Sequence, residues 1–149
     1  MENEPVPVCK RCDIAMMAYS PQYGGLLTGK YQRGTPPDPE SRAGKTKSFA
    51  DRLTDETFDV VEKIEAVAQR LEMGLNQLAV LWVMQKDFCC IPIIGGSKPE
   101  HFDPLYEIVD REIPEEDMEY LADLTRSYRF QDFVNQPQIG GSSPALNWF

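Results

Sequence analysis

Long hydrophobic runs are missing from this sequence, since no stretch reaches the roughly 18 consecutive apolar residues that cross a bilayer. The N-terminal residues MENEPVPVCKRCD also lack the cationic and apolar regions of a secretory signal peptide. These two absences predict a protein that has no membrane span and is located in the cytoplasm.

Positive charge is scarce. The chain has 15 lysines and arginines against 24 aspartates and glutamates, which gives a formal net charge of -9 and a pI near 4.6. The overall field of such a protein repels phosphate, so we expect neither nucleic acid nor an anionic membrane to be its main partner. Any polyanion must be bound by a local group of residues.

Histidine and cysteine, the usual ligands of zinc, are few. The one histidine is His101, and the four cysteines form a C-x-x-C, Cys9 and Cys12, and an adjacent pair, Cys89 and Cys90. A four-thiolate zinc site uses two well-spaced pairs, whereas neighbours on a strand point to opposite faces. A thioredoxin-like C-x-x-C follows a strand, and this one precedes the first strand expected here. We interpret the cysteines as ordinary buried thiols, with a zinc or redox site as the alternative.

The chain is long enough for one domain, because 149 residues with 42% apolar content can bury a core. Two short segments, 14–20 (IAMMAYS) and 89–94 (CCIPII), are almost continuously apolar. Continuous hydrophobicity is typical of strands that are covered on both faces, as in a parallel sheet.

Two helices are expected between these strands. Residues 21–49, rich in Gly, Pro and Lys, are predicted to form a long loop without regular structure. An amphipathic helix then begins at a cap, Thr54 or Asp55, and ends at Gly74. Asn76 is expected to cap a second helix, over 77–86, which is apolar almost all round and therefore buried.

Two further helices are expected after the second strand. Pro99 opens one that Pro104 interrupts or shortens, and Pro114 opens the other. The order of strand, loop, two helices, strand and two helices is a βαβ unit with an elaborated crossover. We divide the chain into a domain over 1–130 and a flexible C-terminal tail over 131–149.

The second strand ends in a cluster of small and basic residues, IPIIGGSKPE, residues 91–100. Gly95 and Gly96 let the backbone approach a ligand, the following helix N-terminus offers N–H groups to an anion, and Ser97 and Lys98 add a hydroxyl and a charge. The pattern is neither a Walker motif nor the dinucleotide fingerprint, so an ordinary strand-to-helix turn explains it equally well.

The first strand ends in a similar way, in SPQYGGLLTGK, residues 20–30. Ligands of parallel α/β sheets bind at the edge where the strands have their carboxyl ends. The two segments together therefore predict a phosphate-binding site at that edge.

Three stretches resemble the aldo-keto reductases. AYSPQYGGLLTGKY, residues 18–31, is similar to the family's AYSPLGxGLLTGKY; IPIIGGSKPEHF, residues 91–102, is similar to its cofactor-binding IPGxSxPEQL; and NQLAVLWVMQ, residues 76–85, looks like the helix before the last barrel strand. The order and spacing agree over roughly residues 5–127. The resemblance implies an α/β fold, the C-terminal portion of a TIM-type (β/α)8 barrel from just before the seventh strand, with two parallel strands and surrounding helices.

The resemblance also implies that the protein binds NADP(H) and reduces carbonyls to alcohols. Tyr19 stands where the family often has an aromatic residue that stacks on the nicotinamide. The residues implied to run beside the nicotinamide and pyrophosphate are Ser20, Pro21, Gln22 and Gly24. Those implied to hold the adenosine 2′-phosphate are Gly95, Gly96, Ser97, Lys98 and His101.

Two positions depart from the family pattern. Pro104 and Leu105 stand where many members have Glu-Asn contacting the adenine, and neither can supply those polar contacts. His101 stands where Arg or Gln is common, so we expect weaker and more pH-dependent binding of the 2′-phosphate.

None of the family's catalytic residues is assigned within this sequence. The resemblance implies that the catalytic Asp, Tyr, Lys and His come from the second, third and fourth strands, which precede the matched region, and His101 lies in the cofactor motif. Carbonyl reduction needs a proton donor beside the hydride acceptor. We therefore expect an NADP-dependent oxidoreductase represented by a truncated or split chain, inactive by itself.

A sheet of two parallel strands has two open edges and needs cover on both faces. The helices can cover one face, so we expect the other to be exposed or to contact a complementary chain or a second copy. The alternative function is a non-catalytic remnant of the nucleotide site that acts through binding or assembly with a partner chain.

Overall fold

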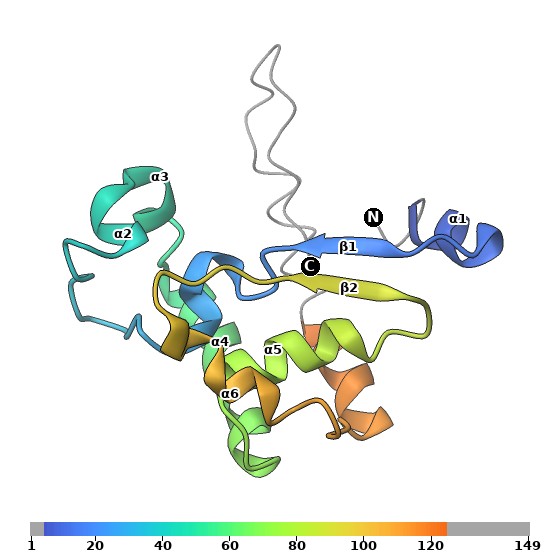
Figure 1. Cartoon of the computed structure of the whole chain (residues 1–149). Helices are drawn as coiled ribbons and strands as arrows, with labels where there is room; N and C mark the ends of the chain where they lie inside the picture. The colour runs from blue at the N-terminus through green and yellow to red at the C-terminus, as the bar shows by residue number, and fades with distance from the viewer. Residues whose placement is uncertain (1–4, 125–149) are drawn as a thin grey trace.

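A two-stranded parallel sheet lies at the centre of the computed structural model, which describes residues 5–124 (Figure 1). The strands are β1 (Met16–Tyr19) and β2 (Cys90–Ile93), and the register runs from Met16 opposite Cys90 to Tyr19 opposite Ile93. Both strands fall inside the predicted segments, and their parallel pairing confirms the expected βαβ unit. The predicted tail over 131–149 lies outside the described residues, so the division at 130 stays a prediction.

The crossover between the strands contains two long helices, α4 (Asp55–Arg70) and α5 (Leu75–Met84). Thr54 caps α4, as expected, because its hydroxyl accepts a hydrogen bond from the Thr57 N–H at 3.2 Å. The helix ends four residues before the predicted Gly74, since Glu72 adopts a left-handed backbone with a φ of 51°.

The start of α5 differs from the prediction by two residues. Gly74, not Asn76, precedes the helix, and its N–H donates to the side-chain oxygen of Gln77 at 2.6 Å. A glutamine at the third helical position can reach back to the helix start in this way, so the side chain of Asn76 is not needed as a cap.

The prediction that residues 21–49 lack regular structure is wrong. They contain a 3-10 segment, η1 (Tyr23–Thr28), the short helix α2 (Arg42–Lys45) and most of α3 (Lys47–Ala50). The Ser41 hydroxyl caps α2 by accepting from the Gly44 N–H at 3.2 Å. Burial of Tyr31 and Phe49 then anchors the segment to the core, with their ring centroids 5.8 Å apart.

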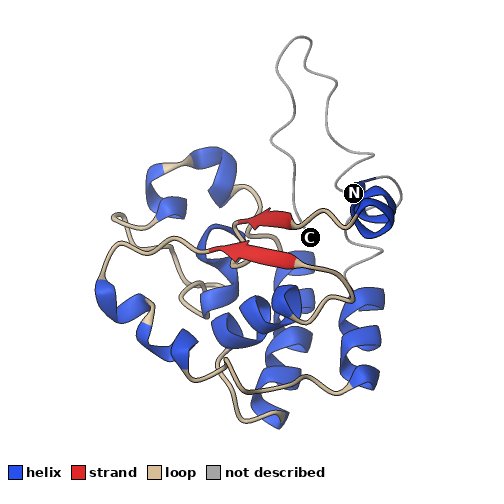
Figure 2. Cartoon of the chain, turned by 45° about the vertical axis from the view of Figure 1, so that its right-hand side comes forward, coloured by secondary structure: helices blue, strands red, loops and turns tan. Residues whose placement is uncertain are grey.

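The remaining helices are short (Figure 2). The chain begins its described part with α1 (Pro5–Cys12). After β2 come η2 (Pro99–His101) and α6 (Asp103–Tyr106), so the helix predicted to open at Pro99 is divided into two pieces around Pro104. Residues 115–124 are helical and follow Pro114, as predicted.

The core lies between the sheet and the helices on one of its faces. Nearly every side chain of α5 is buried, with Leu78 and Val80 each 1% exposed, and Ala18, Cys90 and Ile94 pack against this core from the sheet. In Figure 1 α5 runs beneath the two strands, and α6 lies below α5.

The opposite face of the sheet presents apolar side chains to solvent. Met17 is 65% and Tyr19 62% exposed, and their neighbours in register, Ile91 and Ile93, are also exposed. We call these four residues the open sheet face. The exposure agrees with the expectation that the helices within residues 5–124 cover one side of the sheet and leave the other open.

No helix in the described part of the chain is both long and apolar enough to cross a bilayer.

Candidate functional site

The carboxyl ends of both strands lie at one edge of the sheet, because the strands are parallel and in register. Beyond the ladder, the Ser20 N–H still donates to the carbonyl of Ile93 at 3.3 Å. The two glycine-containing segments of the sequence therefore start side by side, as predicted.

The segment after β1 makes a tight turn around Ser20. The Ser20 hydroxyl accepts a hydrogen bond from the Gly24 N–H at 3.1 Å, and the Gln22 carbonyl accepts one from the Gly25 N–H at 3.0 Å. Gly24 and Gly25 have φ values of 64° and 96°, in the left-handed region that favours glycine. The turn buries Pro21, whereas Tyr19 points to the open sheet face.

Two cationic side chains lie over this turn: Lys30, which belongs to the segment 20–30 that the sequence analysis singled out, and Arg42, which it missed. A Cβ on Gly24 would lie 2.8 Å from a guanidinium nitrogen of Arg42, and a Cβ on Gly25 would lie 2.6 Å from the Lys30 ammonium nitrogen. The turn therefore depends on glycine for the approach of positive charge as well as for its backbone angles.

Aromatic rings support the cations near the turn. The Arg42 guanidinium lies 5.1 Å from the centroid of Phe49, and Arg52 donates to the Tyr23 hydroxyl at 3.1 Å. The sequence contains a signal for Arg42, namely the local excess of lysine and arginine between residues 30 and 52 of an acidic protein. We interpreted this excess only as part of a long loop, because the spacing of the residues does not indicate that α2 returns to the first strand.

The segment after β2 is exposed from Gly95 to His101. A Cβ on Gly95 would meet no atom within 4 Å, whereas one on Gly96 would lie 2.8 Å from the Phe102 ring. The Ser97 N–H donates to Nδ1 of His101 at 3.3 Å, and Lys98 precedes η2. These residues therefore form one solvent-accessible turn with two potentially cationic side chains.

The role expected for a helix N-terminus at this turn needs correction. The element that follows Lys98 is η2, a 3-10 turn of three residues, and the His101 N–H already bonds the Lys98 carbonyl at 3.2 Å. A turn of three residues aligns few peptide dipoles, so its N-terminus attracts an anion only weakly. Any anion held here would be bound by the glycine backbone and the side chains of Ser97, Lys98 and His101.

The positions of Pro104 and Leu105 agree with their apolar chemistry. Leu105 is buried in the core, and the Pro104 carbonyl accepts a hydrogen bond from the Gln77 side chain at 2.6 Å. Both residues thus link α6 to α5.

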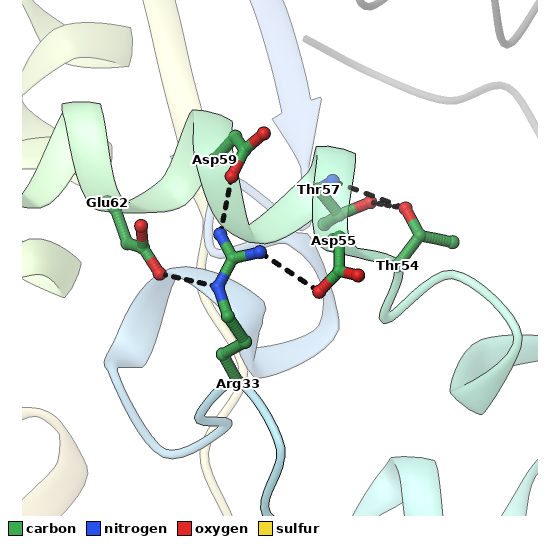
Figure 3. A network of polar contacts seen from close by, with 6 residues as sticks. All are labelled: Arg33, Thr54, Asp55, Thr57, Asp59 and Glu62. Atoms are coloured by element: carbon green, nitrogen blue, oxygen red, sulfur yellow. Dashed lines mark hydrogen bonds and ion pairs between the residues drawn. The ribbon is translucent and has the colours of Figure 1, made fainter.

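An arginine fastens the loop after η1 to α4 (Figure 3). Arg33 donates to Asp55 at 2.9 Å, to Asp59 at 2.5 Å and to Glu62 at 3.1 Å. The hydrogen bonds to Glu62 and Asp59 raise the pKa of the Arg33 guanidinium, so it stays charged at every ordinary pH. This attachment holds the segment between Lys30 and Arg42 against α4.

The cysteines are not the buried thiols that we expected. Cys12 and Cys89 are exposed and Cys9 and Cys90 are partly buried, all four as free thiols. Among residues 5–124, no group of three or more His, Cys, Asp or Glu side chains is arranged to hold a metal ion. The zinc alternative therefore has no support in the described residues.

The residues at this edge suit a ligand with phosphate groups. They offer backbone N–H groups at glycine turns, the hydroxyl of Ser97, and the charges of Lys30, Arg42 and Lys98. An exposed carboxylate, Glu100, also lies in the second turn, between Lys98 and His101. We call the donors and cations of this set, together with Ser20 and His101, the cationic edge. Its composition fits the phosphates of a nucleotide cofactor.

Comparison with known proteins gives the same fold and places the chain in a family. The structure of a glycerol dehydrogenase from Gluconobacter oxydans matches with a TM-score of 0.70 and 19% identity, over 96% of this chain and 42% of that chain. The match shows that this is an α/β protein with the fold of part of a TIM-type barrel.

The family is defined by sequence. The sequence model of the aldo/keto reductase family matches residues 1–126 of this chain. The chain therefore belongs to the aldo/keto reductase family of oxidoreductases. An aryl-alcohol dehydrogenase of Pestalotiopsis microspora is 27% identical over 130 residues, 87% of this chain, and the NADH-specific methylglyoxal reductase of Escherichia coli is 29% identical over 100 residues, 67% of this chain. This chain spans 31% of the first protein and 30% of the second.

Proposed function

We propose that this chain supplies the cofactor-binding portion of an NADP-dependent aldo-keto reductase, an enzyme that interconverts carbonyls and alcohols. The observation that carries the proposal is the cationic edge, where two glycine turns and three permanently cationic side chains lie beside the carboxyl ends of paired parallel strands. Family membership supports a nicotinamide cofactor as the ligand.

The residues of the first turn are proposed to hold the nicotinamide and pyrophosphate part of the cofactor. Ser20, Pro21, Gln22 and Gly24 shape the turn, Tyr19 offers a ring at its start, and Lys30 and Arg42 add positive charge for the pyrophosphate. Bound NADPH would supply hydride to a carbonyl carbon. The contribution of this chain is to bind the cofactor and fix its orientation.

The residues of the second turn are proposed to hold the adenosine 2′-phosphate. Gly95 and Gly96 give backbone access, Ser97 and the Nε2 of His101 donate hydrogen bonds, and Lys98 provides charge. This assignment makes the cofactor NADP rather than NAD. The relative from Escherichia coli is named as NADH-specific, so the choice of cofactor within the family has to be measured for each chain.

Calorimetric titration of the full chain with NADP, and with NAD as a control, tests the proposed site. We expect NADP to bind more tightly, and Lys98→Ala to weaken NADP binding by about tenfold or more while NAD binding changes little, because the lysine contacts only the additional phosphate. Lys63→Ala is the matched control, since Lys63 is an exposed lysine on α4. Equal affinity for the two nucleotides, or equal effects of both substitutions, would contradict the assignment.

The catalytic residues are proposed to lie on polypeptide outside these 149 residues, in a truncated or split arrangement. The proposal is supported by the share of its relatives that the chain spans and by the place of its single histidine in the second turn. We expect the chain alone, supplied with NADPH and a reactive aldehyde, to give no enzyme-like turnover. Turnover by the purified chain would overturn this part of the proposal.

The second candidate is a non-catalytic protein that keeps the nucleotide site and acts through assembly. The open sheet face favours it, because four exposed apolar side chains in register offer a contact surface for a complementary chain or a second copy. A reading frame beside this one that encodes the other six barrel strands would favour the split enzyme. A cytoplasmic location and the exclusion of nucleic acid stay predictions from the sequence.

A further inference from the structure

A surface cavity of about 200 Å³ lies between α1 and the start of β2, away from the cationic edge. Cys9 lines it from α1 and Cys89 lines it from the residue before β2. The two cysteines are far apart in sequence, so it is the fold that brings them to one cavity.

Backbone hydrogen bonds fix the two cysteines on either side of the same short stretch of chain. The Cys9 carbonyl accepts from the Ile14 N–H at 2.9 Å, and the Cys89 carbonyl accepts from the Met16 N–H at 2.9 Å. Ile14 and Met16 are two residues apart, so about 7 Å of chain at most separates the two N–H groups that the cysteine carbonyls bind. The two cysteines therefore lie near each other, and formation of a bond requires α1 to move toward the start of β2.

The attachment of α1 allows such a movement. No residue of α1 is buried. Lys10 links the helix to the loop before β2 through an exposed ion pair with Asp87 and by lying 5.7 Å from the centroid of the Phe88 ring. Exposed ion pairs contribute little to stability, so the position of α1 is weakly held.

The other two thiols are less suited to this pairing. Cys12 is exposed and does not line the cavity. Cys90 turns toward the core, and burial raises the pKa of its thiol, which lowers the fraction of reactive thiolate. Adjacent residues on a strand also point to opposite faces, which disfavours a bond between Cys89 and Cys90.

We propose that Cys9 and Cys89 form an oxidation site, at which a reversible disulfide joins α1 to the start of β2. With glutathione disulfide as oxidant, one protein thiolate attacks a glutathione sulfur and releases glutathione. The second protein thiolate then attacks the mixed disulfide and releases another glutathione. Two protein thiols are oxidised, one glutathione disulfide is reduced, and the two protons leave on the two glutathione thiols.

Peptide mapping of the full chain after treatment with glutathione disulfide tests the site. Trypsin cleaves after Lys10 and Arg11, so Cys9 and Cys12 fall in different peptides, whereas Cys89 and Cys90 share the peptide that begins at Asp87. Fragmentation of the linked peptide between Cys89 and Cys90 in the mass spectrometer identifies which of these two is bonded. We expect the peptide of Cys9 linked to that of Cys89, lacking two hydrogens, to exceed every other intramolecular product. Cys9→Ser and Cys89→Ser should each reduce the intramolecular disulfide by about tenfold or more, and Cys12→Ser should leave it unchanged.

The same reaction in denaturant is the control for the fold. The close pair Cys9 and Cys12 should then predominate, because loop closure favours neighbours in an unfolded chain. In native buffer the oxidised protein should unfold at a temperature at least about 5 °C higher than the reduced protein, since the bond closes a loop of about 80 residues. The same product distribution with and without denaturant, or a native product that links Cys9 to Cys12 or to Cys90, would overturn the proposal.

Discussion

At the scale of single residues, Gly24 shows how backbone freedom and charge are combined at the proposed site. Its φ of 64° is one that side chains with a Cβ rarely adopt, and a Cβ there would also contact Arg42 and Phe49. Gly34 has a similar φ of 72° but open space around it. A substitution at Gly34 therefore adds backbone strain alone, whereas one at Gly24 adds backbone strain and steric crowding.

We expect Gly34→Ala to lower the free energy of unfolding by about 1 kcal/mol, through strain alone. Gly24→Ala should cost about 1–2 kcal/mol more, because the ring of Phe49 and the guanidinium of Arg42 must move as well. Chemical denaturation of both variants measures the difference. If Gly34→Ala is at least as destabilising as Gly24→Ala, the close approach of Arg42 is not a feature of the folded protein.

Among the residues proposed to bind the 2′-phosphate, His101 differs most from the arginine that is common in the family. Its Nδ1 accepts a hydrogen bond from the Ser97 N–H, so in this arrangement the ring donates only through Nε2. An arginine carries its charge at every ordinary pH and can donate two hydrogen bonds to one phosphate. We expect His101→Arg to tighten NADP binding by about tenfold.

Calorimetric titration of His101→Arg and of the natural chain with NADP and with NAD checks this expectation. Affinity for NAD, which lacks the 2′-phosphate, should be the same in both proteins. An equal change for the two nucleotides would mean that residue 101 does not contact the phosphate.

At the scale of elements, Arg33 connects the loop after η1 to α4. Three carboxylates surround its guanidinium, and all three partners are largely exposed. We expect Arg33→Met to leave the global stability almost unchanged, because exposed ion pairs contribute little, yet to increase the mobility of the loop that carries Arg42.

Amide hydrogen exchange across residues 29–46 measures this effect. Exchange in that segment should be faster in Arg33→Met than in the natural chain, and high salt should produce a smaller change in the same direction. Lys47→Met is the matched control, since it removes an exposed cation from the neighbouring helix α3. Equal exchange in both variants would show that the carboxylates on α4 do not restrain the loop.

The sequence predicted the long elements and the strand ends better than it predicted the site. Apolar periodicity located α4, and continuous hydrophobicity located α5 and both strands, because these elements bury most of their side chains. It missed α2 and α3, whose four residues each are too few to show a period. Ser20, Gly24 and Lys30 were found from the strand end, whereas Arg42 reaches the same turn through tertiary folding that no local pattern encodes.

At the scale of the whole molecule, the two faces of the sheet differ in what covers them. The helices bury one face, and the open sheet face exposes Met17, Tyr19, Ile91 and Ile93. Contiguous exposed apolar side chains of this kind mark contact surfaces or aggregation sites in soluble proteins. Covering them would remove apolar area from water at a gain of about 25 cal/mol per Å².

We therefore expect the average mass of the purified chain, measured by light scattering, to rise with concentration. Met17→Thr combined with Ile91→Thr should move this association to concentrations at least about tenfold higher, because it removes a pair of facing apolar side chains. Threonine also suits a strand, so the sheet itself should persist. The change in the midpoint of association measures the contribution of the open sheet face.

A control at another exposed apolar position makes the test specific. Val109 is 62% exposed and lies in the segment after α6 rather than on the sheet, so Val109→Thr removes exposed apolar area without altering the open sheet face. It should leave the concentration dependence unchanged. If the natural chain stays monomeric at all concentrations and unfolds in one sharp thermal transition, the open sheet face is compatible with an independent fold and needs no partner. If both variants shift association equally, general surface hydrophobicity rather than this face causes it.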